Sequence, residues 1–537
     1  MDRIFRLFWL LIVLSALPLA QLASSQQVSG SGRTSTVSNE KYAADRILVK
    51  FRHSTSAEAR SAVHAIAGTH TLRQYTAIRD LELVGLSAAQ TVRDVLSAYR
   101  QRPEIEYAEP DYIVHLLKSP NDPLFPQMWN LLNTGQNGGT AGDDVGATLA
   151  WNLSTGDHNV VVASIDTGID YTHPDLIPNL FHNTAVCNGI DDGTNGCYGI
   201  STIYYTSDVF DDNGHGTHVS GILGAAGNNN LGVVGINWNV QLMSCKFLDS
   251  TGSGQTSDAI SCLDYVLQMK NSGYNIVATN NSWGGSQYSQ ALTDAIQAQQ
   301  QAGILFVAAS GNAFSDNDVA PTYPANTLLP NVISVAATTR TDALAVFSNL
   351  GQHSVHLGAP GEEILSTWPG NNYQVLSGTS MATPHVTGAA ALLSAQQPTL
   401  DWRGTKNLIL AGGDSRSSLA QTITGKRLNL NGSMTCSGKT ETGRLQPVND
   451  VIAATPSAAV TLEELNVNCA QPAGNVQVTV SPSGQTITLV DDGTGADQAA
   501  GDGVYTSQWT PPSAGSYTLT FPGGDVVDAE VLMFERG

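Results

Sequence analysis

Basic residues are scarce in this chain. Its 537 residues include 25 lysines and arginines against 46 aspartates and glutamates, so the formal net charge is −21. A surface of this sign repels phosphate backbones and anionic lipid head groups. We therefore expect no nucleic-acid partner, while the excess of carboxylates provides ligands for calcium.

Long hydrophobic runs are also lacking. The apolar run at residues 7–17 is shorter than the ~20 residues that a bilayer-spanning helix needs. Arg3 and Arg6 precede this run and small residues follow it up to Ser25, which is the pattern of a secretory signal peptide. We expect residues 1–25 to be that peptide. We also expect the protein to have no membrane anchor and to be secreted to the extracellular space. A periplasmic or cell-surface location stays open.

Cysteines are few, and their spacing is not that of a zinc site. Six cysteines are an even number, which in an exported chain favours disulfides. Six cysteines allow fifteen connectivities. Proximity in sequence predicts the pairs Cys187 with Cys197, Cys245 with Cys262, and Cys436 with Cys469.

The chain is longer than one average domain, and the pattern of apolar and polar residues along it changes twice. Residues 26–118 alternate strand and helix signals, which predicts a small α+β module. Residues 119–445 contain continuous apolar runs between helical segments, which predicts an α/β domain with a mostly parallel sheet and helices on both faces. Residues 446–537 hold short runs rich in Val, Thr and Tyr between Gly, Pro and Asp, which predicts a C-terminal β-sandwich.

Three motifs carry residues of nucleophilic catalysis: Asp166 in ASIDTGID, His215 in GHGTHVSG and Ser380 in SGTSMATPH. Asp166 directly follows a buried strand, where α/β sheets place their sites. Ser380 precedes a small-residue helix with Pro384 expected in its first turn, and such a helix start favours the negative charge on an attacked carbonyl. The order Asp, His, Ser is one of the known chain orders of this triad.

Two neighbours of the motifs invite other interpretations. His218 lies one turn after His215 and offers half of a metal pair, but no further ligand cluster accompanies it. We expect His218 to pack or form a hydrogen bond inside the domain. Asp170 competes with Asp166, and we expect it to be structural because the strand ends at Asp166.

Together the three motifs resemble those of the subtilisin-like serine proteases, the subtilases of peptidase family S8. The resemblance implies a subtilisin-like fold and a serine endopeptidase. Ser380 would be the nucleophile, His215 the proton carrier and Asp166 the residue that orients it. It also implies that Asn312, in FVAASGN, donates to the oxyanion together with the Ser380 backbone N–H.

The resemblance further implies a substrate cleft for protein or peptide substrates. The segment NNSWGG would pair with the substrate backbone, and ASG would form the other wall of the pocket. The predicted substrate-binding residues are Ser282, Trp283, Gly284, Ala309, Ser310 and Gly311. No carboxylate is evident in these walls, so we expect broad specificity for apolar to neutral residues. A narrow processing protease stays open.

Calcium is implied by the same resemblance. The ligands would be Asp122 in PNDPLF, Asp175 in HPDL, the Asn229 side chain, and the carbonyls of Gly227, Leu231 and Val233. An all-oxygen set of this size suits Ca²⁺. The predicted sandwich has a second acidic segment, DDGTGADQAAGDG, for which calcium binding and a solvated turn are both open.

The module at residues 26–118 resembles the inhibitor-like propeptides of subtilases. The resemblance implies an intramolecular inhibitor that templates folding and is then cut off, with the first cut between residues 114 and 119. We expect a monomer made as a self-processed zymogen. The alternative is a non-catalytic secreted binding or adhesion protein that uses the subtilase fold as a scaffold.

Overall fold

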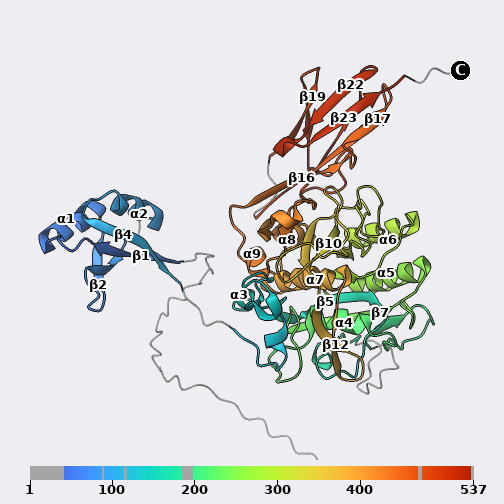
Figure 1. Ribbon diagram of the computed structural model, residues 1–537, viewed down its shortest axis with the longest axis horizontal. Helices are drawn as coiled ribbons and strands as arrows, with labels where there is room; N and C mark the ends of the chain where they lie inside the picture. Colours follow the sequence, from blue (N-terminus) through green and yellow to red (C-terminus); the bar gives the residue numbers. More distant parts are fainter. Residues whose placement is uncertain (1–41, 88–89, 114–117, 184–196, 470–473, 534–537) are drawn as a thin grey trace, which may run out of the picture. The chain divides into compact units, whose positions relative to one another are not determined.

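The computed structural model describes residues 42–87, 90–113, 118–183, 197–469 and 474–533 (Figure 1). The predicted signal peptide, Cys187 and most of the predicted first-cut region lie outside these residues. The described residues fall into two compact units, one within Met1–Val114 and the other within His115–Gly537. No helix in the described ranges has the length and hydropathy that crossing a bilayer requires.

The first unit is a four-stranded antiparallel sheet, in the order β2-β3-β1-β4, with two helices. Helix α2 begins after Thr91, whose hydroxyl accepts a hydrogen bond from the Asp94 amide, and it buries Val92, Val95 and Tyr99. This is the apolar face that the sequence pattern predicts. The elements are β1 Tyr42–Phe51, α1 Ala57–Ala67, β2 His70–Gln74, β3 Leu81–Gly85, α2 Val92–Arg100 and β4 Ile105–Tyr112.

The second unit is built on a nine-stranded sheet in the order β14-β15-β11-β10-β9-β8-β5-β7-β6. All its neighbouring strands are parallel except the β14–β15 pair, so the predicted mostly parallel sheet is confirmed. The strands are β5 Gly156–Asp166, β6 Gly199–Ser201, β7 Asn239–Lys246, β8 Ile276–Asn281, β9 Leu305–Ala309, β10 Val332–Thr338, β11 Leu357–Pro360, β14 Asp414–Ser415 and β15 Lys426–Arg427.

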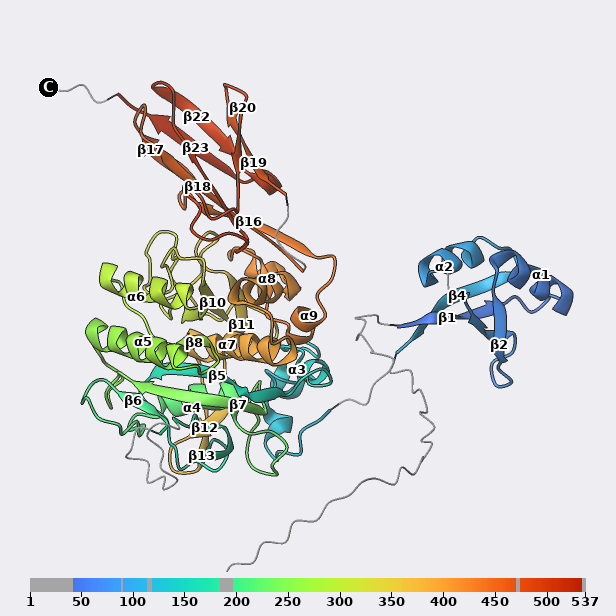
Figure 2. The same ribbon diagram turned by 180° about the vertical axis from the view of Figure 1, so that it is seen from behind.

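Helices cover both faces of this sheet, which explains why its strands read as continuous apolar runs (Figure 2). Val162 of β5 packs in one core with Met381 of α7. Its neighbour Val161 packs in a second core with Leu263 of α5 and Ile296 of α6. The helices are α3 Ala147–Ala150, α4 His215–Gly224, α5 Thr256–Asn271, α6 Gln290–Gln301, α7 Thr379–Gln396, α8 Trp402–Gly412 and α9 Leu430–Met434.

Shorter elements connect these layers. An antiparallel hairpin, β12 with β13, contacts α4. The hairpin strands are Ile364–Trp368 and Asn372–Leu376, and the 3-10 turns are η1 Phe125–Gln127, η2 Gln136–Gly138, η3 Ile177–Asn179, η4 Ser417–Leu419 and η5 Pro522–Gly524.

The C-terminal strands form two sheets, β16-β18-β21 and β17-β23-β22-β19-β20. Their shared core contains Trp509, whose ring meets Tyr517 edge-on at 5.2 Å between centroids. β16 spans the expected boundary at residue 445. The strands are β16 Thr440–Gln446, β17 Val451–Ala454, β18 Val460–Asn468, β19 Val476–Ser481, β20 Gln485–Leu489, β21 Val504–Trp509, β22 Gly515–Thr520 and β23 Val526–Val531.

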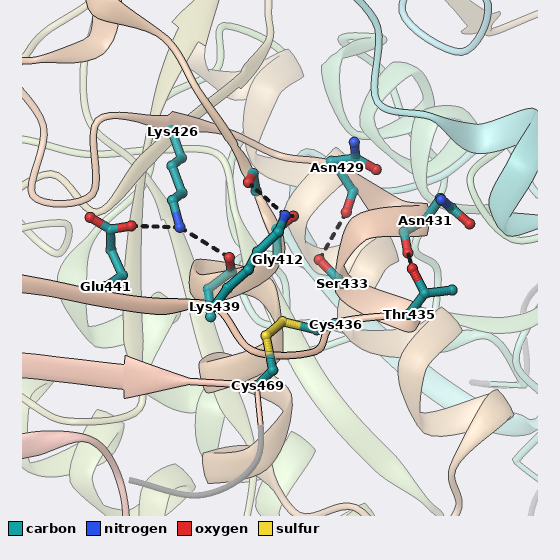
Figure 3. Close-up of a disulfide and its surroundings, with 12 residues drawn as sticks. Gly412, Lys426, Asn429, Asn431, Ser433, Thr435, Cys436, Lys439, Glu441 and Cys469 are labelled. Atoms are coloured by element: carbon teal, nitrogen blue, oxygen red, sulfur yellow. Dashed lines mark hydrogen bonds and ion pairs between the residues drawn. A yellow bond between two sulfur atoms is a disulfide. The ribbon is translucent and has the colours of Figure 1, made fainter. Parts of the chain in front are cut away.

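Disulfides join different elements of the second unit. Cys245–Cys262 links β7 to α5, and Cys436–Cys469 links the segment after α9 to the end of β18, so both predicted pairs are confirmed. Cys197 is also disulfide-bonded. Beside the second disulfide, Lys439 Nζ donates to Gly412 O at 3.1 Å, at the carboxyl end of α8 (Figure 3). A cation there complements the helix dipole.

Candidate active site

Asp166 and His215 meet at the carboxyl edge of the parallel sheet. Asp166 is the last residue of β5 and is fully buried, and His215 is the first residue of α4. The distance from His215 Nδ1 to Asp166 Oδ1 is 2.7 Å. The other oxygen, Oδ2, is buried and accepts no hydrogen bond from the described residues. The pair is therefore a carboxylate fixed against one nitrogen of an imidazole ring.

The Asp166 carboxylate decides the protonation of this imidazole. Burial disfavours the charged imidazolium, but the charge of Asp166 and its hydrogen bond outweigh burial, so the pKa of His215 is raised above its ordinary 6.5. Asp211 adds to the same effect.

Asp211 holds the start of α4 in place, and sequence analysis missed it. Its carboxylate is buried and accepts hydrogen bonds from the amides of Gly214 and Thr217, each at 2.8 Å. It also accepts one from Thr167 Oγ1 at 2.8 Å, which links the helix start to the end of β5. The signal in the sequence was an acidic residue just before a helix, where exposed N–H groups need acceptors.

Ser380 is the second residue of α7 and is bound reciprocally to Ser282, just beyond the end of β8. The Ser380 hydroxyl donates to Ser282 O at 3.1 Å, and the Ser282 hydroxyl donates to Ser380 O at 2.8 Å. Pro384 lies in the second turn of α7, so the expected place in the first turn is wrong, because the helix already begins at Thr379. Having no N–H, Pro384 leaves Ser380 O without its helical donor and free for Ser282.

Asn312 is oriented by the same helix start. Its Oδ1 accepts hydrogen bonds from the Thr379 amide at 2.8 Å and from Thr379 Oγ1 at 2.9 Å. Within the described part of the chain, Nδ2 has no hydrogen-bond partner and is the free end of the amide. A Cβ placed on Gly378 would lie 3.4 Å from Asn312 Nδ2 and 3.6 Å from the Ser380 nitrogen. The two nitrogens thus lie on either side of the space beside the Gly378 Cα. Thr379, which sequence analysis also missed, directs Asn312 Nδ2 toward that space.

A cleft runs beside His215, and its lining includes Ser282, Trp283 and Gly284 of the predicted substrate segment. Its other wall includes Phe247, whose ring meets Trp283 edge-on at 4.9 Å, together with residues 251–256. Sequence analysis missed this wall, although a glycine-rich segment after a strand at the carboxyl edge is a typical site loop. Among the described residues, this lining contains no Asp, Glu, Lys or Arg.

The ASG segment lies close to Ser380, but its side chains do not line this cleft. Ala309 and Ser310 are buried, and Ser310 Oγ donates to Asn349 O at 3.2 Å. The Gly311 amide donates to Thr379 Oγ1 at 3.2 Å. The segment therefore reaches the site through its backbone.

Asp170 and His218 have contacts of their own. Asp170 Oδ1 accepts the Thr172 amide and Oδ2 accepts the Gly370 amide, both at 2.9 Å. His218 Nε2 lies 3.1 Å from Ile364 O and 3.0 Å from Gln374 O. Burial lowers the pKa of His218 to about 4, so it is a neutral ring hydrogen-bonded inside the domain.

The predicted calcium ligands lie together around residues 227–233. Asn229 Nδ2 donates to Asp175 Oδ1 at 2.9 Å, and the Val233 amide donates to Asp175 Oδ2 at 3.0 Å. Asp122 Oδ2 accepts the Asn228 amide at 2.7 Å. Within the described ranges, nothing donates a hydrogen bond to the carbonyl oxygens of Gly227, Leu231 or Val233.

The charge of this cluster fits a cation. Asp122 and Asp175 are buried, and neither forms an ion pair within the described part of the chain. Burial raises the pKa of the Asp122 carboxyl, and the charge of Asp175 adds to the rise. Two adjacent buried carboxylates without a counter-ion are costly, and an oxygen-seeking divalent cation would compensate them.

Comparisons with known proteins agree with the motifs. The family model of the subtilases matches residues 157–423, and that of the fervidolysin N-terminal prodomain matches residues 30–111. A thermophilic serine proteinase of Bacillus sp. (strain AK1) is 33% identical over 387 residues, which cover 70% of this chain and 86% of that protein. Subtilisin-like protease 1 of Plasmodium berghei (strain Anka) is 36% identical over 276 residues, or 46% of this chain and 45% of that protein.

Solved structures are similar as well. One of them is that of a cold-adapted subtilisin-like serine proteinase, with 33% identity and a TM-score of 0.43 over 51% of this chain and 89% of that chain.

The Asp166–His215 pair predicts a specific response to Asp166→Asn. We expect kcat to fall roughly 10⁴-fold, because the imidazole loses its orienting anion. Without the charge that raises the His215 pKa, the acidic limb of kcat/KM should move to lower pH. The measurement is a pH profile with a peptide substrate, after a recognition sequence placed near residue 118 allows an added protease to remove the first unit.

Asp294→Asn, an exposed carboxylate on α6, is the matched control and should leave both quantities unchanged. An acidic limb that stays in place or rises in Asp166→Asn would contradict this assignment of the pair.

Proposed function

The chain belongs to the subtilase family of serine endopeptidases, and on this basis we propose that it is a secreted protease of broad specificity, made as a self-processed zymogen. Peptide bonds of proteins would be cleaved through an acyl-enzyme on Ser380. The observation that carries the proposal is the 2.7 Å contact between His215 and Asp166 beside an uncharged cleft that contains Ser282.

In the first half of the reaction, Ser380 Oγ attacks the scissile carbonyl and His215 takes the hydroxyl proton on its second ring nitrogen. Asp166 stabilises the resulting imidazolium, and its contact with Nδ1 keeps the other nitrogen available for this transfer. The Ser380 hydroxyl donates to Ser282 O at 3.1 Å here and must turn from it toward His215. Catalytic hydrogen bonds often form only when substrate is bound.

The attacked carbonyl oxygen becomes an oxyanion, which needs donors that are already in place. Asn312 Nδ2 and the Ser380 amide flank one point beside Gly378, where such an oxygen would be held. Loss of one donor of this kind costs roughly 10²- to 10³-fold in kcat. His215 then returns the proton to the leaving amine, and water hydrolyses the ester by the same steps.

Control of this activity would come from the first unit. Residues 30–111 match a subtilase prodomain, which supports a propeptide that inhibits the enzyme before it is cut off. A signal peptide at residues 1–25 would direct the precursor out of the cell.

Self-processing is tested by Ser380→Ala in the full-length precursor. In a protease-free host, the unsubstituted chain should lose its first unit by a cut near residue 118, whereas Ser380→Ala should remain full length because it has no nucleophile. Mass spectrometry of both purified chains measures the outcome. A Ser380→Ala chain that is still cut at the same bond would refute processing by this site.

Broad specificity is proposed because the cleft offers no charged side chain to select a substrate charge. Main-chain pairing would supply affinity, and the Trp283 and Phe247 rings would accept apolar residues. Cleavage of a mixed peptide library should show many residues before the cut bond, with apolar and neutral ones preferred. Cuts confined to positions after Lys or Arg would contradict the proposal.

We further propose that Asp122, Asp175, Asn229 and the carbonyls of Gly227, Leu231 and Val233 bind a structural calcium. Calcium at 100 times its Kd would stabilise the chain by about 2.7 kcal/mol. Chelation should therefore lower the Tm of the Ser380→Ala chain, and Asp122→Asn should reduce this shift. Asp264→Asn, an exposed carboxylate on α5, should not. An equal calcium-dependent shift in Asp122→Asn and its control would remove this site.

A further inference from the structure

The loop between β20 and β21 gathers three carboxylates. Asp491, Asp497 and Asp502 each offer one oxygen, and these three oxygens lie within 4.8 Å of one another. Asp502 is fully buried and Asp497 is 6% exposed. Like charges this close inside a protein repel strongly, so the cluster needs a compensating partner.

Two buried oxygens of the cluster have no hydrogen-bond donor. Asp497 Oδ1 and Asp502 Oδ2 accept nothing from the described residues. The second oxygen of each carboxylate is engaged, since Asp502 Oδ1 accepts the Val504 amide at 2.8 Å and Asp497 Oδ2 accepts the Gly493 amide. In each of these two carboxylates, the loop therefore holds one oxygen by a hydrogen bond and leaves the other oxygen without a donor. A buried oxygen without a donor lowers stability unless a ligand binds there.

The neighbouring lysine offsets only part of the charge of the cluster. Lys406 of α8 is buried nearby and its charge acts on Asp502, but its Nζ donates to Pro330 O at 2.7 Å and forms no ion pair with a carboxylate in the described ranges. Glu463 lies in the same cavity as Lys406 and shares that charge. One positive charge cannot balance the three carboxylates of the cluster together with Glu463.

The rest of the loop is pre-formed around the cluster. Asp491 accepts the amides of Gly501, Asp502 and Gly503, which holds the far end of the loop against its beginning. Gly501 and Gly503 have φ of +76° and +83°, a left-handed conformation that favours glycine. Asp492, by contrast, is part of an exposed turn in which its Oδ1 accepts the Thr494 amide.

From this geometry we propose that Asp491, Asp497 and Asp502 bind one Ca²⁺ ion in the C-terminal sandwich, at its boundary with the α/β layers. Carboxylate oxygens from a glycine-rich loop are typical calcium ligands, and calcium tolerates irregular geometry. Magnesium requires a near-ideal octahedron and retains most of its water, which suits a buried, dry cluster poorly. This site is separate from the calcium site proposed at Asp122 and Asp175 and does not depend on catalysis.

The position of the loop links this ion to the packing of the sandwich. Gln498 Nε2 donates to Leu328 O at 3.4 Å, and a Cβ on Gly503 would lie 2.9 Å from Asn407 Oδ1 of α8. Asp497 and Lys406 line one cavity between the two layers. An ion that orders the loop therefore also orders the surface by which the sandwich contacts α8.

The test counts bound calcium in the full-length chain carrying Ser380→Ala, which prevents self-digestion. Equilibrium dialysis with radioactive calcium should show that Asp497→Asn with Asp502→Asn binds one ion fewer per chain. Asp492→Asn, in the same loop but outside the cluster, should bind the full number. Equal stoichiometry in both variants would overturn the proposal, as would loss of the ion in Asp492→Asn.

A second measurement does not depend on how the variants fold. In the Ser380→Ala chain, calcium should slow amide hydrogen exchange in residues 491–504 relative to chelator, and equal concentrations of Mg²⁺ should not. Unchanged exchange in this segment would also overturn the proposal. In Asp122→Asn the slowing should persist, so failure of the other calcium site is distinguishable from failure of this one.

Discussion

The candidate active site depends on how closely α4 approaches the end of β5. A Cβ on Gly216 would lie 2.2 Å from the backbone oxygen of Gly168, so only glycine fits at this position while α4 lies this close to the segment after β5. The Gly216 amide donates to Thr167 Oγ1 at 2.8 Å, which fixes the same approach through a hydrogen bond. Because His215 and Asp166 flank this contact, the distance between them is set by the backbone rather than by their own side chains.

Features that are local in sequence could be predicted. The buried strands follow from continuous apolar runs, Asp166 follows from its place after one of them, and two disulfides join cysteines close in sequence. Contacts between remote segments could not be predicted. Asp211 and Thr379 act on residues 44 and 67 positions away through side-chain hydrogen bonds, which leave no periodic pattern. The place of Pro384 was missed because the helix begins one residue before Ser380.

Buried carboxylates in this acidic chain fall into two groups, which differ in whether a basic side chain pairs with them. Some are paired with buried arginines, as Asp342 is with Arg427 at 2.8 Å, and the half-buried Asp525 is likewise paired with Arg444 at 2.8 Å. Others, at Asp122 with Asp175 and in the loop before β21, have no such partner among the described residues. With only 25 basic residues available, the chain can compensate part of its buried charge with side chains. The remaining buried charge requires cations from solution, so the stability of the fold depends on the ions that the solution contains.

The Cys436–Cys469 disulfide joins cysteines 33 positions apart, and the loop that it closes contains β16, β17 and β18. If another molecule of the same protease cuts any one bond inside that loop, the two pieces remain covalently attached. The β-sandwich is then retained on the nicked enzyme, and its strands stay close enough to keep their pairing. Molecules of a protease can cleave one another. A cut inside this loop would release the β-sandwich from a chain without the disulfide, whereas the cross-linked chain keeps it.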